Sequence, residues 1–176
     1  SVNLVGCCDE ESIRLIKMLN VEQVKTTECL KFIIQDLEKG FYTTDEICQI
    51  MLWALKNLAF LKNENSFVIG WLSALKFIPL PCGNSVKVSD LFDPELEILQ
   101  NLFYMEEETR FPTTTFTSSP DLLHSLRQLG LRNEVQLSEK DVLHVAQKIE
   151  ELQSRDEPEW DFVIKKAKTL LQILNR

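Results

Sequence analysis

The residues in this chain best suited to nucleophilic chemistry are its cysteines and histidines. A thiol beside an imidazole can ionise to a thiolate, which is the reactive form of cysteine. The sequence offers Cys7, Cys8 and Cys82 as nucleophiles, and His124 and His144 as bases. No sequence context typical of a cysteine-dependent enzyme family surrounds any cysteine. A small cysteine-dependent enzyme is therefore an alternative hypothesis and not the leading one.

The chain also lacks the usual patterns for binding metals or phosphates. His124 and His144 fall in separate predicted helices, and neither has another histidine, cysteine or carboxylate beside it at a zinc-binding spacing. No GxSxG, GxxxxGK(S/T) or GxGxxG sequence is present to cradle an oxyanion or a phosphate. We therefore expect no metal site, no cofactor and no enzymatic activity.

Cysteine usage predicts a reducing compartment. The count is odd, two cysteines are adjacent, and no CxxC pair occurs, so neither a disulfide framework nor a zinc knuckle is indicated. The N-terminus lacks the basic and hydrophobic regions of a signal peptide, and the start at Ser1 without methionine is typical of a piece of a longer protein. We expect a cytoplasmic protein whose free thiols pack as small hydrophobic side chains. The cysteines are Cys7, Cys8, Cys29, Cys48 and Cys82.

The charge balance disfavours polyanionic partners. The 176 residues carry a formal net charge of −8, which repels nucleic acid and anionic lipid. Lys165, Lys166 and Lys168 form the notable basic cluster, and a solvated helix face explains it. The apolar runs are interrupted by charge well short of a membrane span. We expect protein partners, with no nucleic acid and no membrane.

Asp93-Pro94 joins an acidic residue to a proline between two apolar clusters. An aspartate can accept hydrogen bonds from the first free amides of a helix, and proline is tolerated at the first helical position. Glu95 then favours the positive end of the helix dipole. The pair is therefore predicted to begin a helix and not to act as a reactive site. A catalytic Asp93 would instead lie in a solvent-filled cleft facing a histidine.

Helical spacing of apolar residues and helix-capping signals cover most of the chain. A capping box is predicted at Thr43 and Glu46, a proline start at Ser119-Pro120, and a glycine stop at Gly130. We expect the helix after Glu46 to be central, because it is apolar on most of its circumference. Further helices are predicted to start at Asp9, Thr26 or Thr27, Phe67, Asp93, Ser138 and Pro158.

The segment 76–89 changes character, because prolines forbid a helix and Gly83-Asn84 suits a turn. A short β-hairpin or extended pair is predicted there, with Pro79 and Pro81 restricting the first segment to an edge. The predicted fold is mainly α, a multi-helix bundle with this one hairpin. The organisation is a single module, 1–176, with an alternative division into subdomains 1–75 and 76–176.

Residues 106–118 are the least regular part and are predicted to form an extended loop. Phe111 and Phe116 are either anchors onto the loop's own domain or an interaction patch for a peptide. Anchoring is the favoured interpretation, because exposed aromatic side chains are costly unless a partner uses them.

Three motifs between Lys76 and Leu131 resemble the large internal repeats of the sacsin family. In that family an LFDP-type segment follows an FxP stretch and precedes an FP loop and a helix that ends in LGL. The combination is fairly specific because all the motifs occur in order and at compatible spacing. The residues are Leu91, Phe92, Asp93 and Pro94, then Phe111 and Pro112, then Leu129, Gly130 and Leu131.

The resemblance implies a function linked to chaperones. Members of the family are giant cytoplasmic proteins whose repeats begin with a region similar to the Hsp90 nucleotide-binding domain, and J and ubiquitin-like domains link them to Hsp70 and the proteasome. This chain shows neither the ATP-holding motifs of that region nor a His-Pro-Asp triplet. The resemblance therefore implies a helical part of a repeat outside the ATPase region, serving a co-chaperone as a non-catalytic scaffold or protein-interaction module. Chaperones, client proteins or neighbouring domains would be its partners, and a purely architectural spacer is a further alternative.

Overall fold

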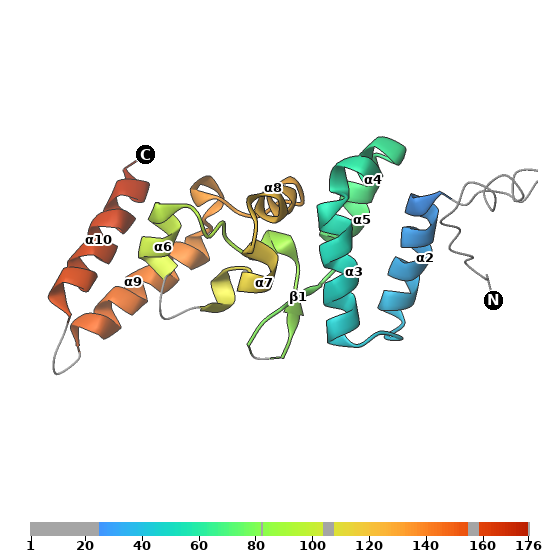
Figure 1. The fold of residues 1–176 in the computed structure, drawn as a ribbon. Coiled ribbons are helices and arrows are strands. Elements are labelled where there is room, and N and C mark those ends of the chain that lie inside the picture. The colour runs from blue at the N-terminus through green and yellow to red at the C-terminus, as the bar shows by residue number, and fades with distance from the viewer. Residues whose placement is uncertain (1–24, 82, 104–107, 155–158, 176) are drawn as a thin grey trace, which may run out of the picture.

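The computed structural model describes residues 25–81, 83–103, 108–154 and 159–175. Their helices form an elongated row, with α2 at one end, α10 at the other, and the hairpin and α7 near the middle (Figure 1). The mainly helical fold with one two-stranded antiparallel sheet confirms the predicted fold class for the described residues. The helices are α2 (Thr26–Glu38), α3 (Thr44–Lys56), α4 (Leu58–Glu64), α5 (Val68–Ala74), α6 (Glu97–Phe103), α7 (Thr114–Thr117), α8 (Pro120–Gln128), α9 (Glu139–Gln153) and α10 (Trp160–Leu174), with 3-10 turns at Val88–Asp90, Glu108–Arg110 and Glu134–Gln136.

Side chains next to the helix starts make the predicted capping hydrogen bonds. The Glu46 amide donates to Thr43 Oγ1 at 3.3 Å, and the Thr43 amide donates to the Glu46 carboxylate at 2.8 Å, which confirms the capping box of α3. Ser119 Oγ accepts from the Leu122 amide at 3.3 Å, which confirms the start of α8. The predicted helix that begins at Asp9 lies outside the described residues.

Helix α3 supplies much of the larger core but is not buried all round. Met51, Ala54 and Leu55 are buried, and the helix packs against α4 and α8. Trp53, on the opposite side, remains 45% exposed. The apolar circumference predicted a central helix; α3 is central to the larger core, but its neighbours cover only part of its circumference.

The hairpin forms where the prolines and Gly83-Asn84 predicted it. Strand β1 (Ile78–Pro79) pairs antiparallel with β2 (Ser85–Val86), so that Ile78 lies opposite Val86. Gly83 has φ +84°, a left-handed conformation that side chains other than glycine rarely adopt. The prediction of one short hairpin is confirmed.

Buried apolar residues form two separate cores. The larger core contains residues of helices α2, α3, α4, α5 and α8, of the hairpin, and the side chains of Leu91 and Phe116. The smaller one contains Phe92 with residues of α6, α9 and α10. Residues before and after position 75 contribute to the larger core. The alternative division into subdomains 1–75 and 76–176 stays a prediction. Within the described ranges, no helix is long and apolar enough to cross a membrane.

Candidate functional site

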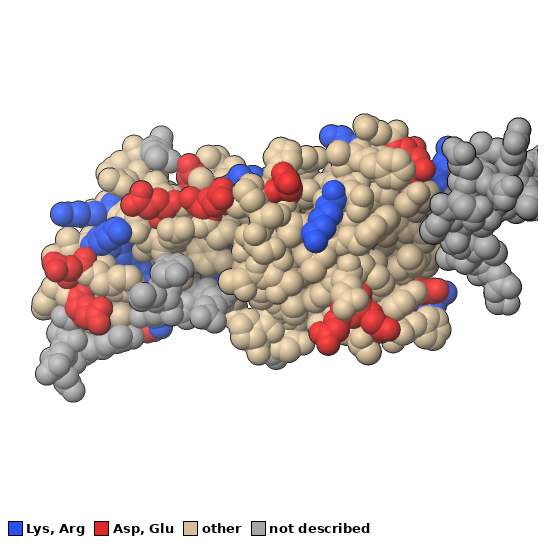
Figure 2. Space-filling view, viewed as in Figure 1, with Lys and Arg blue, Asp and Glu red and all other residues tan. Residues whose placement is uncertain are grey.

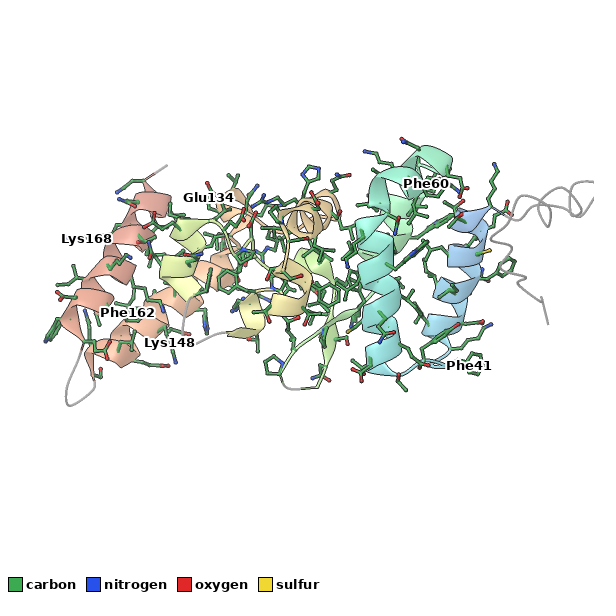
Figure 3. All side chains as sticks on the ribbon, in the orientation of Figure 1. Phe41, Phe60, Glu134, Lys148, Phe162 and Lys168 are labelled. Carbon is green, nitrogen blue, oxygen red and sulfur yellow. The ribbon has the colours of Figure 1, made fainter. Side chains whose placement is uncertain are left out.

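The three motifs, far apart in sequence, meet between the two cores. The Phe92 amide donates to the Arg110 carbonyl at 2.8 Å, and the Asp93 amide donates to the Arg132 carbonyl at 2.9 Å. The Arg132 amide in turn donates to the Leu91 carbonyl at 2.9 Å. Figure 3 shows side chains crowding the space between α6, α8 and α9. We call residues 91–94, 110–112 and 129–132 the motif junction.

The LFDP segment contributes to both cores because its side chains alternate. Consecutive side chains of an extended segment point to opposite sides. Leu91 accordingly packs in the larger core, and Phe92 packs in the smaller one. Phe92 also forms a parallel bridge with Arg132. The motif therefore links the two cores through adjacent residues.

Asp93 is anchored through both of its carboxylate oxygens. Oδ1 accepts from the Glu95 amide at 3.0 Å, and Arg127 of α8 donates to Oδ2 at 2.5 Å and to Oδ1 at 3.1 Å. Hydrogen bonds to Asp93 and then to Glu95 raise the pKa of Arg127, so the guanidinium stays charged. The Asp93 side chain is only 6% exposed. It is a buried attachment point for α8 and not a carboxylate in an open cleft facing a histidine.

The prediction that Asp93-Pro94 begins a helix is wrong in position. Helix α6 begins at Glu97, and Pro94 lies in a turn before it. The Pro94 carbonyl accepts a hydrogen bond from the Gln100 side chain instead of a helical amide, and the Gln100 amide donates to the Leu96 carbonyl at 3.0 Å. Asp93 therefore caps a turn, and the helix proper starts afterwards.

Asp141, near the start of α9, joins two arginines of the motif junction. Arg110 donates to Oδ1 at 2.9 Å, and Arg132 donates to Oδ2 at 2.7 Å. Burial raises the pKa of this carboxyl, but hydrogen bonds from the Ser138 hydroxyl and amide and from Arg132 outweigh burial and lower the pKa to about 2. Asp141 therefore remains ionised at neutral pH. It also forms a capping box with Ser138, where a helix start was predicted.

Two stacked phenylalanines lie between the same arginines. The rings of Phe92 and Phe103 have centroids 4.7 Å apart and planes 8° apart. The Arg132 guanidinium lies 4.4 Å from the Phe92 centroid, and that of Arg110 lies 5.4 Å from the Phe103 centroid. Guanidinium groups are attracted to aromatic faces. Each guanidinium thus makes two kinds of contact. Its plane lies near an aromatic ring, and its N–H groups donate hydrogen bonds to Asp141.

The LGL motif ends α8 and turns the chain into the junction. Gly130 has φ +101°, its amide donates to the Arg127 carbonyl, and the Leu131 amide donates to the Leu126 carbonyl. These two bonds define a Schellman motif. The predicted glycine stop is confirmed, and it places Arg132 beside Phe92.

The two candidate interaction aromatics have different surroundings. Phe116 is fully buried, and its ring centroid lies 5.7 Å from that of Phe77. It therefore anchors α7 and offers no surface to a peptide, as the anchoring interpretation expects. Phe111 is half-buried against the smaller core, and Pro112 is buried. The interaction-patch interpretation is wrong for Phe116 because the ring is inaccessible.

The structure brings no cysteine and histidine together among the residues it describes. Cys7, Cys8 and Cys82 lie outside those residues. Burial, and then the charge of Asp45, raise the pKa of the Cys48 thiol, which is the opposite of what a nucleophile requires. His124 is exposed and contacts the Gln128 side chain at 2.8 Å. No group of residues suited to a metal ion occurs in the described ranges.

Sequence reasoning missed the residues that hold the motif junction together. These are Arg110, Arg127, Arg132 and Asp141. One signal was available, since Arg110 directly precedes the FP motif and Arg132 directly follows LGL. An arginine suits the binding of a carboxylate, because its planar guanidinium carries several hydrogen-bond donors in a fixed geometry. The position of these two arginines next to the motifs was therefore a usable signal.

The fold and the junction define a multi-helix module in which the motif-bearing loops act as structural links between helices. Neither a family model nor a solved structure matches the chain. The chain is 52% identical, over all of its 176 residues, to human sacsin, and it spans 4% of the length of that protein. The chain belongs to the sacsin family.

Proposed function

We propose that this chain is a non-catalytic helical scaffold and protein-interaction module of a sacsin-type co-chaperone. It acts in the cytoplasm with the Hsp70 and Hsp90-type chaperone systems. Its partners are chaperones, client proteins or neighbouring domains of the same chain. The similarity to sacsin over the whole chain supports this assignment, together with the lack of recognisable ATP-holding motifs in the sequence.

The observation that carries the proposal is the full engagement of the buried carboxylates in the motif junction. Asp93 and Asp141 are 5% and 4% exposed, and each is bonded to arginine. A general acid or base must reach the proton that it transfers. These carboxylates are instead committed to holding helices together, which is the role expected of a scaffold.

Nucleotide titration tests the non-catalytic part of the proposal. The 176-residue chain is titrated with Mg-ATP in a calorimeter, and phosphate release is followed in parallel. We expect neither binding nor turnover, since no phosphate-binding loop is recognisable in the sequence. Tight ATP binding or turnover by the chain alone would contradict the assignment.

A binding panel tests the interaction part. The immobilised chain is exposed to purified Hsp70-type and Hsp90-type chaperones and to unfolded client proteins. We expect saturable binding to at least one of them. A stable fold without binding to any of them would favour the purely architectural spacer.

A further inference from the structure

Helix α10 carries two apolar faces, and the described residues cover only one of them. The inner face packs on α9 and α6, with Val163 2% and Leu170 8% exposed. The second face, which we call the outer stripe, follows a 4-3-4-3 spacing along the helix. Its residues are Trp160, Ile164, Ala167, Leu171 and Leu174.

The outer stripe is continuous and exposed. At 3.6 residues per turn, these positions fall within an arc of roughly 80°. Its four large side chains are between 46% and 58% exposed. Alternating steps of four and three are the spacing with which one helix packs against another. The small Ala167 at the centre allows a second backbone to approach closely.

The position of α10 leaves this face accessible. The helix forms one end of the row, with α9 and α6 on one side only (Figure 1). Helix α10 therefore carries more hydrophobic residues than its packing against α9 and α6 requires. A solvated apolar face of this length is costly, and it is typical of a surface that a partner covers.

A charged edge with a net positive charge borders the outer stripe, because the exposed Asp161, Lys165 and Lys168 share it. Lys165 and Lys168 are exposed, and neither is in an ion pair within the described part of the chain. Lys166, predicted to share a solvated cluster with them, is instead 1% exposed and lies 5.4 Å from the Phe162 ring centroid. Figure 3 labels Phe162 and Lys168 on α10, and Figure 2 shows both basic and acidic atoms at this end of the molecule.

The charges beside the outer stripe distinguish between three possible binding partners: a second copy of the chain, a membrane and a helix of another protein. A second copy would pack antiparallel about Ala167 and bring two Lys165–Lys168 edges together, where like charges repel. An anionic membrane would meet a chain of net charge −8, and an arc of this width is narrow for insertion among lipids. An acidic edge on a partner helix would instead neutralise the two lysines.

Building on the proposed function, we propose that the outer stripe of α10 binds an amphipathic helix of a partner protein. That helix carries apolar residues at the same spacing and a glutamate- or aspartate-rich edge. The apolar stripe supplies affinity, and Lys165 and Lys168 select the acidic partner and set its orientation.

A charge-swapped pair of synthetic helices tests this inference. The probe is an acidic peptide of about three heptads with leucines in the helical seam, and its match has lysine in place of each glutamate. Fluorescence anisotropy with the 176-residue chain measures both. We expect the acidic peptide to bind about tenfold or more tightly than the basic one, equivalent to about 1.4 kcal/mol.

Two double variants separate the apolar contribution from the charge contribution. Ile164→Glu with Leu171→Glu should abolish binding of the acidic peptide. Lys165→Glu with Lys168→Glu should reverse the preference, so that the basic peptide binds more tightly. The control, Gln35→Glu with Gln49→Glu, adds the same charge as the first variant on exposed sites of α2 and α3 and should bind like the wild type. Circular dichroism checks that all variants remain folded.

Several results would overturn the inference. Equal binding of both peptides would show non-specific adhesion, and loss of binding in the control would place the site elsewhere. Dimerisation through α10 in sedimentation, or binding to anionic phosphatidylserine vesicles that Ile164→Glu with Leu171→Glu removes, would assign the stripe to another occupant. Loss of peptide binding in a longer chain of the parent protein would show that the stripe is covered within that chain. None of these results bears on ATP, so the proposed function is tested separately.

Discussion

At the scale of single residues, buried carboxylates and arginines explain how the motif loops are held. Asp93 binds Arg127, and Asp141 binds both Arg110 and Arg132. Partly buried ion pairs of this kind are costly to break on one side, because the remaining charge loses its partner. The free energy of unfolding should therefore depend strongly on these few side chains.

Asp141→Asn should destabilise the chain in a pH-dependent way. The pKa of Asp141 is lowered from 3.8 to about 2 in the folded state, so its ionised form contributes stability above the unfolded value. We expect the substitution to lower the free energy of unfolding by about 2 kcal/mol at neutral pH. The difference from wild type should shrink as the pH falls from about 4 to about 2. Denaturant unfolding across this range measures it.

Asp121→Asn is the matched control for this experiment. Asp121 is an exposed aspartate in the first turn of α8. Its substitution should change stability by about 0.5 kcal/mol or less. A loss at Asp141 that stays constant down to the lowest pH would show that the carboxylate charge does not act through the arginines.

A double-mutant cycle should separate the two acidic partners of Arg127. The Asp93 side chain is 6% exposed and that of Glu95 is 60% exposed, although both contact the same guanidinium. We expect a coupling of about 1–2 kcal/mol between Asp93→Asn and Arg127→Met. The cycle with Glu95→Gln should give about 0.5 kcal/mol or less, because water screens the exposed pair. Equal couplings from urea unfolding would contradict the assigned role of Asp93.

At the scale of elements, the sequence predicts helix ends better than it predicts contacts. The capping box at Thr43 and the glycine stop at Gly130 depend on residues that are adjacent along the chain, so local chemistry is sufficient. The start of α6 was misplaced, because Asp93 caps a turn at Pro94 and the helix itself begins at Glu97. The capping signal at Asp93 is local, whereas Arg127, which also binds this carboxylate, lies 34 residues along the chain.

The junction itself could not be derived from spacing. Arg110 lies 31 residues from Asp141, and Arg127 lies 34 residues from Asp93. Nothing local selects one carboxylate over another at such separations, because the choice depends on how the helices pack. The family resemblance indicated which segments matter, and the structure shows that they meet.

Two glycines with different backbones provide a matched test at this scale. Gly130 has φ +101°, whereas Gly70 lies within α5 without a positive φ, and an added Cβ would meet nothing within 4 Å at either site. Gly130→Ala should cost about 1–2 kcal/mol through left-handed strain. Gly70→Ala should stabilise the chain by about 0.5–1 kcal/mol, because alanine favours the helix. Thermal unfolding compares the two, and destabilisation by both substitutions would contradict the backbone argument.

At the scale of the whole molecule, the junction joins two cores that otherwise share few elements. Leu91 and Phe92 place adjacent side chains in different cores, and Arg132 holds the second of them from the end of α8. The elongated row in Figure 1 therefore depends on this connection to behave as one unit. The proposed scaffold role, with α10 presented at one end, would require such rigidity.

Native-state hydrogen exchange on Arg132→Met tests this central claim most directly. Arg132 pairs with Asp141 and covers the Phe92 ring, so its loss should weaken both cores together. Mass spectrometry should show faster exchange in residues 51–61 of the larger core and in residues 142–152 of the smaller one, relative to wild type. Unchanged protection in both segments would contradict the structural role of the junction.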